Sequence, residues 1–249
     1  MDMTGNTILI TGGGSGIGRA LAEALHARGN KVIVSGRRAS VLEEVAAANP
    51  GIATAALDVA DAAGIARFAA EIVAAHPDLN VVIHNAGIMQ AEKLTTAGSD
   101  LATAETTIAT NLLGPLRLNA ALLPHLLAQP KATVITVSSG LASVPLTATP
   151  TYSATKAAIH SWSQSLRHQL KGTNVEVIEI APPAVATDLM PGHAANPNSM
   201  PLADYIAETM AQLEAGAPEN LTERVKFLRF AERRGDYDKV FALLNDGAH

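Results

Sequence analysis

The segment Tyr152-Ser153-Ala154-Thr155-Lys156 carries a phenol and an ammonium group four residues apart. On an α-helix this spacing places both side chains on one face, with their Cβ atoms roughly 5–6 Å apart. A free tyrosine titrates near pH ~10, and a fixed positive charge beside it favours the phenolate. We therefore expect Lys156 to lower the pKa of Tyr152 toward neutral pH, where a phenol can serve in general acid–base catalysis. The alternative is an exposed pair of side chains on a helix surface.

A glycine-rich segment runs from Thr11 to Gly18, after one apolar run and before a helical pattern. Glycines let the backbone approach a pyrophosphate without a Cβ in the way. The amide groups and the dipole of a helix start attract an anion. The sequence therefore predicts a dinucleotide-binding turn with G-x-x-x-G-x-G spacing. Its expected contacts are Gly12, Gly14, Ser15, Gly16, Ile17 and Gly18.

Two arginines, Arg37 and Arg38, follow the second apolar run, where a dinucleotide-binding fold contacts the ribose. A carboxylate there would hold a ribose 2′-hydroxyl, but this chain has Ser35 and Gly36 before the two guanidinium groups. Because a guanidinium group binds a phosphate through paired N–H donors, we expect NADP(H) rather than NAD(H). The alternative is that both arginines merely begin a solvated helix.

Secondary-structure elements must position these residues, and the chain alternates short apolar runs with longer amphipathic ones. The expected strands are Thr7–Ile10, Lys31–Val34, Thr54–Leu57, Val81–Ile83, Thr133–Val137 and Val175–Ile180. Most of these runs are rich in β-branched residues, which is typical of strands buried on both faces of a parallel sheet. The expected helices are Ile17–Arg28, Ser40–Ala48, Ala62–Ala75, Asp100–Leu127, Thr151–Leu170, Leu202–Leu213 and Leu221–Leu244.

This alternation predicts an α/β fold, a single-domain Rossmann-like doubly wound parallel sheet with helices on both faces, over residues 1–249. Gly114-Pro115 interrupts one helical pattern, so we expect a kink or break there. The proline-rich segment 181–201 is long for a connection, and a loop and helix at about 185–213 are expected to cover a substrate. A loop without function is the alternative. Five side chains predict an apolar pocket there: Leu189, Met190, Met200, Leu202 and Ile206.

Composition limits the partners. Apolar residues make up 48% of the chain, charged residues 16%, and the net charge is −5, with no cysteine. No block of like charge exists, so neither nucleic acid nor a membrane surface is an expected partner. Without a membrane span or a signal peptide, a cytoplasmic location is expected. The histidines lack metal-ligand spacing, so no metal site is expected, and His26, His76, His125, His160 and His168 are scattered.

Taken together, the glycine turn, Asn85-Ala86-Gly87, Ser139, Tyr152 and Lys156 resemble the short-chain dehydrogenase/reductase superfamily. The resemblance runs from about Thr7 to Thr187. It implies hydride transfer between a nicotinamide cofactor and a carbonyl compound or an alcohol. A glycine turn or a Tyr–Lys pair alone would be weak evidence, but these motifs occur in the family's order and at its separations.

The resemblance implies four catalytic residues. Tyr152 would exchange a proton with the substrate oxygen, and Ser139, at the family's serine position, would donate a hydrogen bond to it. Lys156 would lower the pKa of Tyr152 and hold the nicotinamide ribose. Asn111 would anchor a water molecule leading from Lys156 toward solvent.

The resemblance also implies further cofactor contacts. Asp58 and Val59 would meet the adenine, and Asn85, Ala86 and Gly87 would pack against the cofactor. Tyr152 and Lys156 would contribute, together with Pro182, Val185 and Thr187 after the sixth strand. Pro183 stands where the family commonly has glycine, and the family's glycine-rich last strand is missing. Both departures resemble a bacterial oxidoreductase branch typified by the product of a D-alanyl-lipoteichoic-acid operon.

The resemblance further implies a homodimer or homotetramer built through the helix that carries Tyr152. Small side chains that would let another helix approach follow one face of this helix: Ala154, Ala158, Ser161 and Ser165. These small side chains could instead pack against a helix of the same chain.

The leading interpretation is an NADP(H)-dependent oxidoreductase acting on a small carbonyl or alcohol substrate. A non-catalytic NADP(H) sensor or scaffold is the alternative, and a dehydratase or epimerase is a third possibility.

Overall fold

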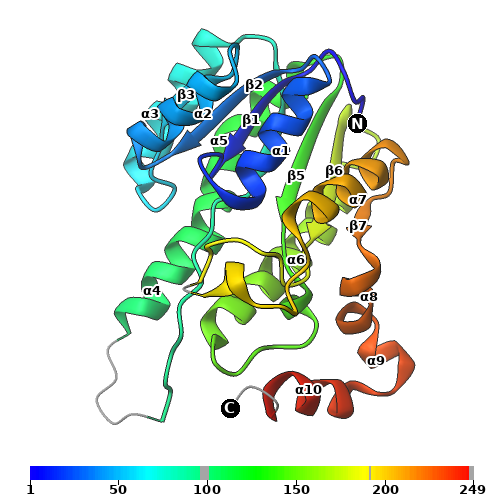
Figure 1. Ribbon diagram of the computed structural model, residues 1–249. Coiled ribbons are helices and arrows are strands. Elements are labelled where there is room, and N and C mark those ends of the chain that lie inside the picture. Colours follow the sequence, from blue (N-terminus) through cyan, green and yellow to red (C-terminus); the bar gives the residue numbers. More distant parts are fainter. Residues whose placement is uncertain (96–100, 191, 247–249) are drawn as a thin grey trace.

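The computed structural model describes residues 1–95, 101–190 and 192–246. Seven parallel strands form one sheet in the order β3-β2-β1-β4-β5-β6-β7 (Figure 1). The strands are β1 (Thr7–Thr11), β2 (Lys31–Gly36), β3 (Ala53–Ala56), β4 (Leu79–His84), β5 (Ala132–Val137), β6 (Val175–Ala181) and β7 (Glu219–Leu221). This arrangement confirms the predicted doubly wound parallel sheet.

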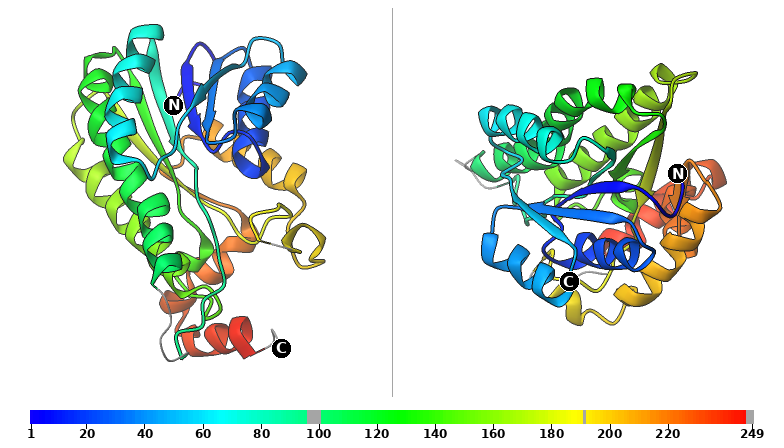
Figure 2. Two further views of the ribbon diagram at one scale, coloured as in Figure 1. Left: turned by 90° about the vertical axis from the view of Figure 1, so that its left-hand side faces the viewer. Right: turned by 90° about the horizontal axis from the view of Figure 1, so that it is seen from above.

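Helices cover both faces of the sheet (Figure 2). On one face α1 (Gly16–Ala27), α2 (Ala39–Ala48) and α7 (Leu202–Glu214) contribute to one apolar cluster with the strands. On the other face α3 (Ala62–Ala75), α5 (Gly114–Ala128) and α6 (Pro150–Gln169) contribute to a second cluster. Strand residues alternate between the two clusters, so that Ile8 and Ile10 join the first and Leu9 the second.

Local sequence signals explain where several helices begin. The Asp61 side chain accepts a hydrogen bond from the Ala63 amide at 3.0 Å and thereby caps α3. Pro150 lies in the first turn of α6, where its missing N–H removes no helical hydrogen bond. The helix that carries Tyr152 therefore begins two residues before it.

The long helical pattern around Asn111 is not broken at Gly114-Pro115. Helix α4 (Ala102–Ile108) continues through a π-helical turn (Ala109–Leu113) into α5. The irregularity therefore lies just before Gly114. Pro115 fits because it stands in the first turn of α5. The predicted kink is replaced by a π-turn, a feature frequent at functional sites.

The C-terminal part differs from the predicted single helix Leu221–Leu244. Residues 219–221 form the short edge strand β7 beside β6, so a last strand is present although it contains no glycine. Three helices follow, namely α8 (Glu223–Arg229), α9 (Ala231–Arg234) and α10 (Tyr237–Asp246). Gly235 ends α9 with φ of 73°, a left-handed conformation that a continuing helix could not contain.

Among the described residues, no helix combines the length and the apolar character needed to cross a membrane.

Candidate active site

The glycine turn joins β1 to α1 at the carboxyl edge of the sheet. Gly12 and Gly16 have φ of 68° and 53°, which side chains other than glycine rarely adopt. A Cβ at Gly18 would lie 2.3 Å from Asn85 Nδ2 and 2.4 Å from the Gly12 oxygen. The turn therefore has no room for side chains at its two ends. Ser15 precedes α1 in an extended conformation and is exposed, without a side-chain cap.

Thr11 fixes the glycine turn to the end of β4, a role that sequence reasoning missed. Its hydroxyl accepts hydrogen bonds from the amides of Asn85 and Ala86, each at 3.1 Å. The Asn85 side chain donates to the Thr11 oxygen at 2.9 Å and to the Gly12 oxygen at 3.3 Å. The predicted residues of the glycine turn and of the Asn85 segment therefore form one unit.

Arg37 and Arg38 are exposed directly after β2. A surface hollow of about 420 Å³ lies beside Arg37 and is also lined by Asp58, Asp61 and Arg67. Val59 is buried in the core cluster, and its backbone oxygen would lie 2.5 Å from a Cβ at Gly114. The structure thus brings Arg37 and Asp58 together at one hollow. Arg37 follows β2, and β2 is the sheet neighbour of β1, the strand that leads into the glycine turn.

Asn111 lies in the π-helical turn and is almost completely buried. Its Oδ1 accepts from the Ile88 amide at 2.9 Å, and its Nδ2 donates to the Ile88 oxygen at 2.8 Å. Nδ2 also lies 3.3 Å from the Thr155 hydroxyl on α6. Asn111 therefore connects the segment after Gly87 with the helix that carries Tyr152 and Lys156.

Tyr152, near the start of α6, and Ser139, just after β5, are both largely buried. Ser139 follows β5 and accepts a hydrogen bond from the Leu141 amide at 3.1 Å. Burial raises the pKa of Tyr152 to about 12, and a hydrogen bond with Ser139 acts in the opposite direction. The structure thus brings together the phenol and the hydroxyl that the sequence predicts to act on one oxygen.

Lys156 is buried one helical turn after Tyr152, with Nζ 5.6 Å from the centroid of the Tyr152 ring. Nζ donates to the Val137 oxygen at 2.7 Å. Burial lowers the pKa of Lys156 to about 8, and the negative charge of Glu179 opposes this shift. The predicted proximity is confirmed. The predicted fall in the pKa of Tyr152 is wrong, because burial removes hydration from the phenolate and raises this pKa more than the hydrogen bond with Ser139 lowers it.

The segment after β6 returns to the glycine turn. Pro182 accepts a hydrogen bond from the Gly140 amide through its oxygen at 2.8 Å. Val185 is buried and pairs with Met200, and a Cβ at Gly16 would contact the Thr187 side chain at 3.5 Å. Pro182, Val185 and Thr187 therefore border the same edge as the glycine turn.

The expected apolar pocket has a different lining. Met200 is buried in the first core cluster, and Leu202 and Ile206 pack against that cluster. Met200 is therefore a core residue, and Leu202 and Ile206 are partly buried at the edge of the core. A hollow of about 260 Å³ is instead lined by Pro183 and Ala184 and by side chains of the C-terminal helices, among them Leu228, Val240 and Leu244.

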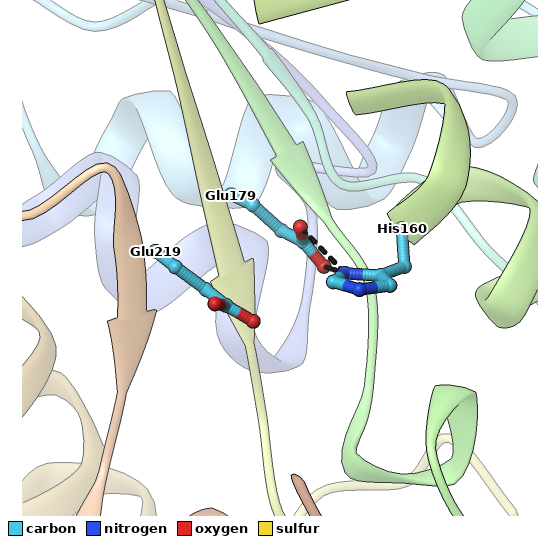
Figure 3. Close-up of side chains that lie close together, drawn as sticks. All are labelled: His160, Glu179 and Glu219. Atoms are coloured by element: carbon cyan, nitrogen blue, oxygen red, sulfur yellow. Dashed lines mark hydrogen bonds and ion pairs between the residues drawn. The ribbon is translucent and has the colours of Figure 1, made fainter. Parts of the chain in front are cut away.

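Sequence reasoning also missed a polar cluster at β6. His160 on α6 lies beside Glu179 on β6, and Glu219 on β7 completes the group (Figure 3). One ligand atom from each lies within 4.8 Å of the others, although the scattered histidines predicted no such cluster. The residues stand 19 and 40 positions apart, so only the strand register unites Glu179 with Glu219.

Three comparisons relate the chain to known proteins. A family model described as short chain dehydrogenase matches residues 6–198. The uncharacterized oxidoreductase DltE of Bacillus subtilis (strain 168) is 41% identical over 249 residues, covering 98% of each chain. A short-chain dehydrogenase from Burkholderia cenocepacia J2315 in complex with NADP has a TM-score of 0.83 at 26% identity, covering 98% of this chain and 99% of that chain.

A third protein extends the likeness at the level of the fold alone. It is a short chain dehydrogenase/reductase from Burkholderia phymatum in complex with NAD. Its TM-score is 0.81 at 20% identity, covering 96% of each chain.

Proposed function

Because the chain belongs to the short-chain dehydrogenase family of oxidoreductases, we propose that it transfers a hydride between NADP(H) and a small carbonyl compound or secondary alcohol. The observation that supports this most is the buried group of Tyr152, Ser139 and Lys156 at the carboxyl edge of the sheet. Open α/β sheets bind their ligands at this edge, where the strand order reverses around β1 and β4.

The residues at this edge fit a dinucleotide. The turn between Gly12 and Gly18 has no room for a Cβ at either end, as close approach of a pyrophosphate requires. Arg37 is exposed beside a hollow and would hold the 2′-phosphate of NADP(H), with Arg38 next to it. The bound cofactor would supply or accept the hydride, while the protein supplies position and charge. One solved relative carries NADP and another NAD, so the preference for NADP(H) depends on these arginines.

Tyr152 is the proposed general acid and base. Its raised pKa keeps the phenol protonated at neutral pH, so in reduction it can give its proton to the substrate oxygen. Ser139 would donate a hydrogen bond to the same oxygen and stabilise the developing negative charge. Lys156 would stabilise the phenolate that remains after proton transfer.

The segment at about 185–213 is proposed to cover one side of the substrate, and the C-terminal helices the other. The hollow bordered by Pro183 and Ala184 is lined mainly by apolar side chains, which favours a substrate with an apolar part. Asn111 would bind a water molecule that leads from Lys156 toward solvent.

The test is NADPH oxidation with a panel of ketones. Wild-type protein should consume NADPH in proportion to the alcohol formed. Tyr152→Phe should lower kcat by about 10²–10⁴-fold while NADPH still binds. The matched control is Tyr237→Phe on α10, where the ring stacks on Phe241 and does not line the hollow, and it should retain activity.

Two other functions predict different results. A sensor or scaffold would bind NADPH and consume none with any ketone. A dehydratase or epimerase would form product without net turnover of the cofactor. Intact Asn111, Ser139, Tyr152 and Lys156 favour the reductase, because a sensor requires none of them.

A further inference from the structure

Polar side chains form a row across four neighbouring strands behind the proposed site. His84, Thr136, Glu179 and Glu219 are register partners on β4, β5, β6 and β7. Register partners in a parallel sheet project from the same face. Val82, Val134 and Val177, two positions earlier on their strands, belong to the cluster under α5 and α6. The row therefore lies beneath the helix that carries Tyr152 and Lys156.

Glu179 is the most deeply buried carboxylate of this row, with 1% of its side chain exposed. Both of its oxygens lie 2.9 Å from His160 Nδ1. Figure 3 shows the imidazole of His160 facing this carboxylate. Among the described residues, the hydrogen-bond partner of this carboxylate is His160. A buried carboxylate is costly unless opposite charge or hydrogen bonds compensate it.

The contacts of His160, Glu179 and Glu219 do not favour a metal site. Glu219 is already bound by Arg229 on α8, whose Nε contacts Oε1 at 2.5 Å. Glu179 is bound by His160. Each carboxylate thus already has a side-chain partner, an arginine for Glu219 and an imidazole for Glu179.

Two observations place Lys156 near Glu179. Lys156 and His160 are four residues apart on α6, so they share the face that covers β5 and β6. Lys156 Nζ donates to the Val137 oxygen, and Val137 is the register partner of Ile180, the residue after Glu179. The electrostatic attraction of Glu179 accordingly counteracts the effect of burial on the pKa of Lys156.

We propose that Glu179 is the buried counter-ion that keeps Lys156 charged, and that His160 connects this carboxylate with solvent. The inference rests on the proposed function, in which Lys156 must be cationic to stabilise the phenolate of Tyr152. Glu179 and His160 are positioning residues in this scheme. They act through Lys156 and do not contact the substrate.

His160 is suited to share the charge of Glu179. Its side chain is 19% exposed, and its Nε2 lies 3.0 Å from the Gln164 amide nitrogen near the surface. An amide offers a donor to a neutral imidazole and, turned by 180°, an acceptor to a cationic one. If His160 is neutral, the negative charge of Glu179 attracts Lys156 in full. If His160 is cationic, it compensates part of that charge, and the attraction between Glu179 and Lys156 is weaker.

The other groups around Lys156 do not supply a second buried anion. Tyr152 on α6 stays protonated because burial raises its pKa. His84 on β4 stays neutral because burial lowers its pKa to about 4. Glu219 on β7 is paired with Arg229 on α8. Among the described residues facing this region, Glu179 is consequently the anion whose charge Lys156 can use.

The experiment titrates Lys156 directly in the protein without cofactor. The chain has seven lysines, so NMR of ¹³C-labelled lysine side chains resolves each midpoint, and Lys156→Met identifies the resonance. Glu179→Gln should lower the midpoint of Lys156 by about one pH unit or more, a tenfold loss of proton affinity. The matched control is Glu176→Gln on the same strand, where the carboxylate binds the N-terminal amine, and it should leave the midpoint unchanged.

Two more variants separate charge from structure. His160→Gln retains the Glu179 charge, so the Lys156 midpoint should not fall. A fall as large as in Glu179→Gln would overturn the counter-ion assignment. If Glu179→Gln does not fold, Glu179→Met combined with His160→Leu replaces the pair by apolar side chains, a change often tolerated for buried ion pairs. The same fall is expected there, and an unchanged midpoint overturns the proposal.

Activity provides an independent readout. The alkaline limb of the kcat/KM profile for ketone reduction should move to lower pH in Glu179→Gln by the amount that NMR measures. If no ketone is reduced but the Lys156 midpoint still falls, the proposed function fails while the Lys156–Glu179 interaction stands. If ketones are reduced and the midpoint does not move, only the interaction is refuted.

Discussion

Burial reverses the order in which the phenol and the amine at the proposed site lose their protons. The pKa of Tyr152 rises to about 12 and that of Lys156 falls to about 8, both because their charged forms lose hydration. At neutral pH the pair is therefore a phenol beside an ammonium group. That is the state needed to protonate a substrate oxygen and then stabilise the phenolate.

This order predicts how stability depends on pH. The pKa of Lys156 is about 8 in the folded chain and 10.5 in its ordinary state. Between these values the unfolded chain binds more protons, so the free energy of unfolding rises with pH. From pH 8 to 10 wild type should gain on the order of 2–3 kcal/mol relative to Lys156→Met. Urea unfolding at both pH values measures this. The exposed Lys171→Met is the control, and equal slopes for wild type and Lys156→Met would contradict the prediction.

Arg37 is the residue on which the cofactor preference depends. Arg37→Asp places a carboxylate where a 2′-phosphate would lie, so NADPH should bind more weakly through repulsion and a lost charge-assisted contact. NADH, which lacks that phosphate, should bind nearly as before. Titration of both cofactors by fluorescence measures the two affinities. Equal loss for NADPH and NADH would exclude the phosphate contact, and the exposed Arg67→Asp at the same hollow tests for a general charge effect.

At the scale of elements, the glycine turn holds its geometry because β1, α1 and the end of β4 meet within contact distance. Gly18→Ala would place a methyl group 2.3 Å from Asn85 Nδ2 and 2.4 Å from the Gly12 oxygen. The turn must shift, so we expect NADPH affinity to fall more than about tenfold, together with a lower Tm. Gly36→Ala is the control, since its methyl group would meet only Leu42 at 3.7 Å. Unchanged affinity in Gly18→Ala would show that this contact does not shape the site.

The strands differ in how well the sequence alone predicts them. The six apolar runs predicted six strands because β-branched residues buried on both faces leave a clear pattern. Strand β7 lacks that pattern, since Glu219 and Asn220 are polar and are held by Arg229 and by the Thr209 oxygen. Its pairing with β6 therefore depends on contacts with other elements of the fold and not on the composition of residues 219–221.

The part of the site that lies within one short segment was predictable from the sequence. The spacing of Tyr152 and Lys156 fixes their proximity on any helix, and the structure confirms it. Two features were not predictable. Burial, which sets both pKa values, depends on the whole fold, and Glu179 meets His160 only through strand register and helix placement.

At the scale of the whole molecule, one face of α6 has small side chains turned away from the core. Ala154, Ser161 and Ser165 are exposed, and Ala158 is partly exposed. We propose that a second copy of the chain covers this face as a homodimer or part of a homotetramer, because small side chains permit close approach of symmetric helices. Such an interface would lie on the helix that carries Tyr152 and Lys156.

Light scattering tests this proposal. Wild type should have the mass of a dimer or tetramer, and Ala158→Arg should give a smaller species because a long charged side chain separates the helices. Ala66→Arg, on the exposed face of α3, is the control and should retain the wild-type mass. A wild-type monomer would contradict the proposal.

The most direct test of the central claim follows the hydride itself. NADPH with deuterium at both C4 positions of the nicotinamide is mixed with a ketone that the wild-type enzyme reduces, and the product is analysed after one turnover by mass spectrometry and NMR. We predict one deuterium on the carbinol carbon per cofactor oxidised in wild type, and transfer at least about a hundredfold slower in Tyr152→Phe. A carbinol carbon without deuterium in wild type, or equal transfer rates in the two proteins, would contradict the account.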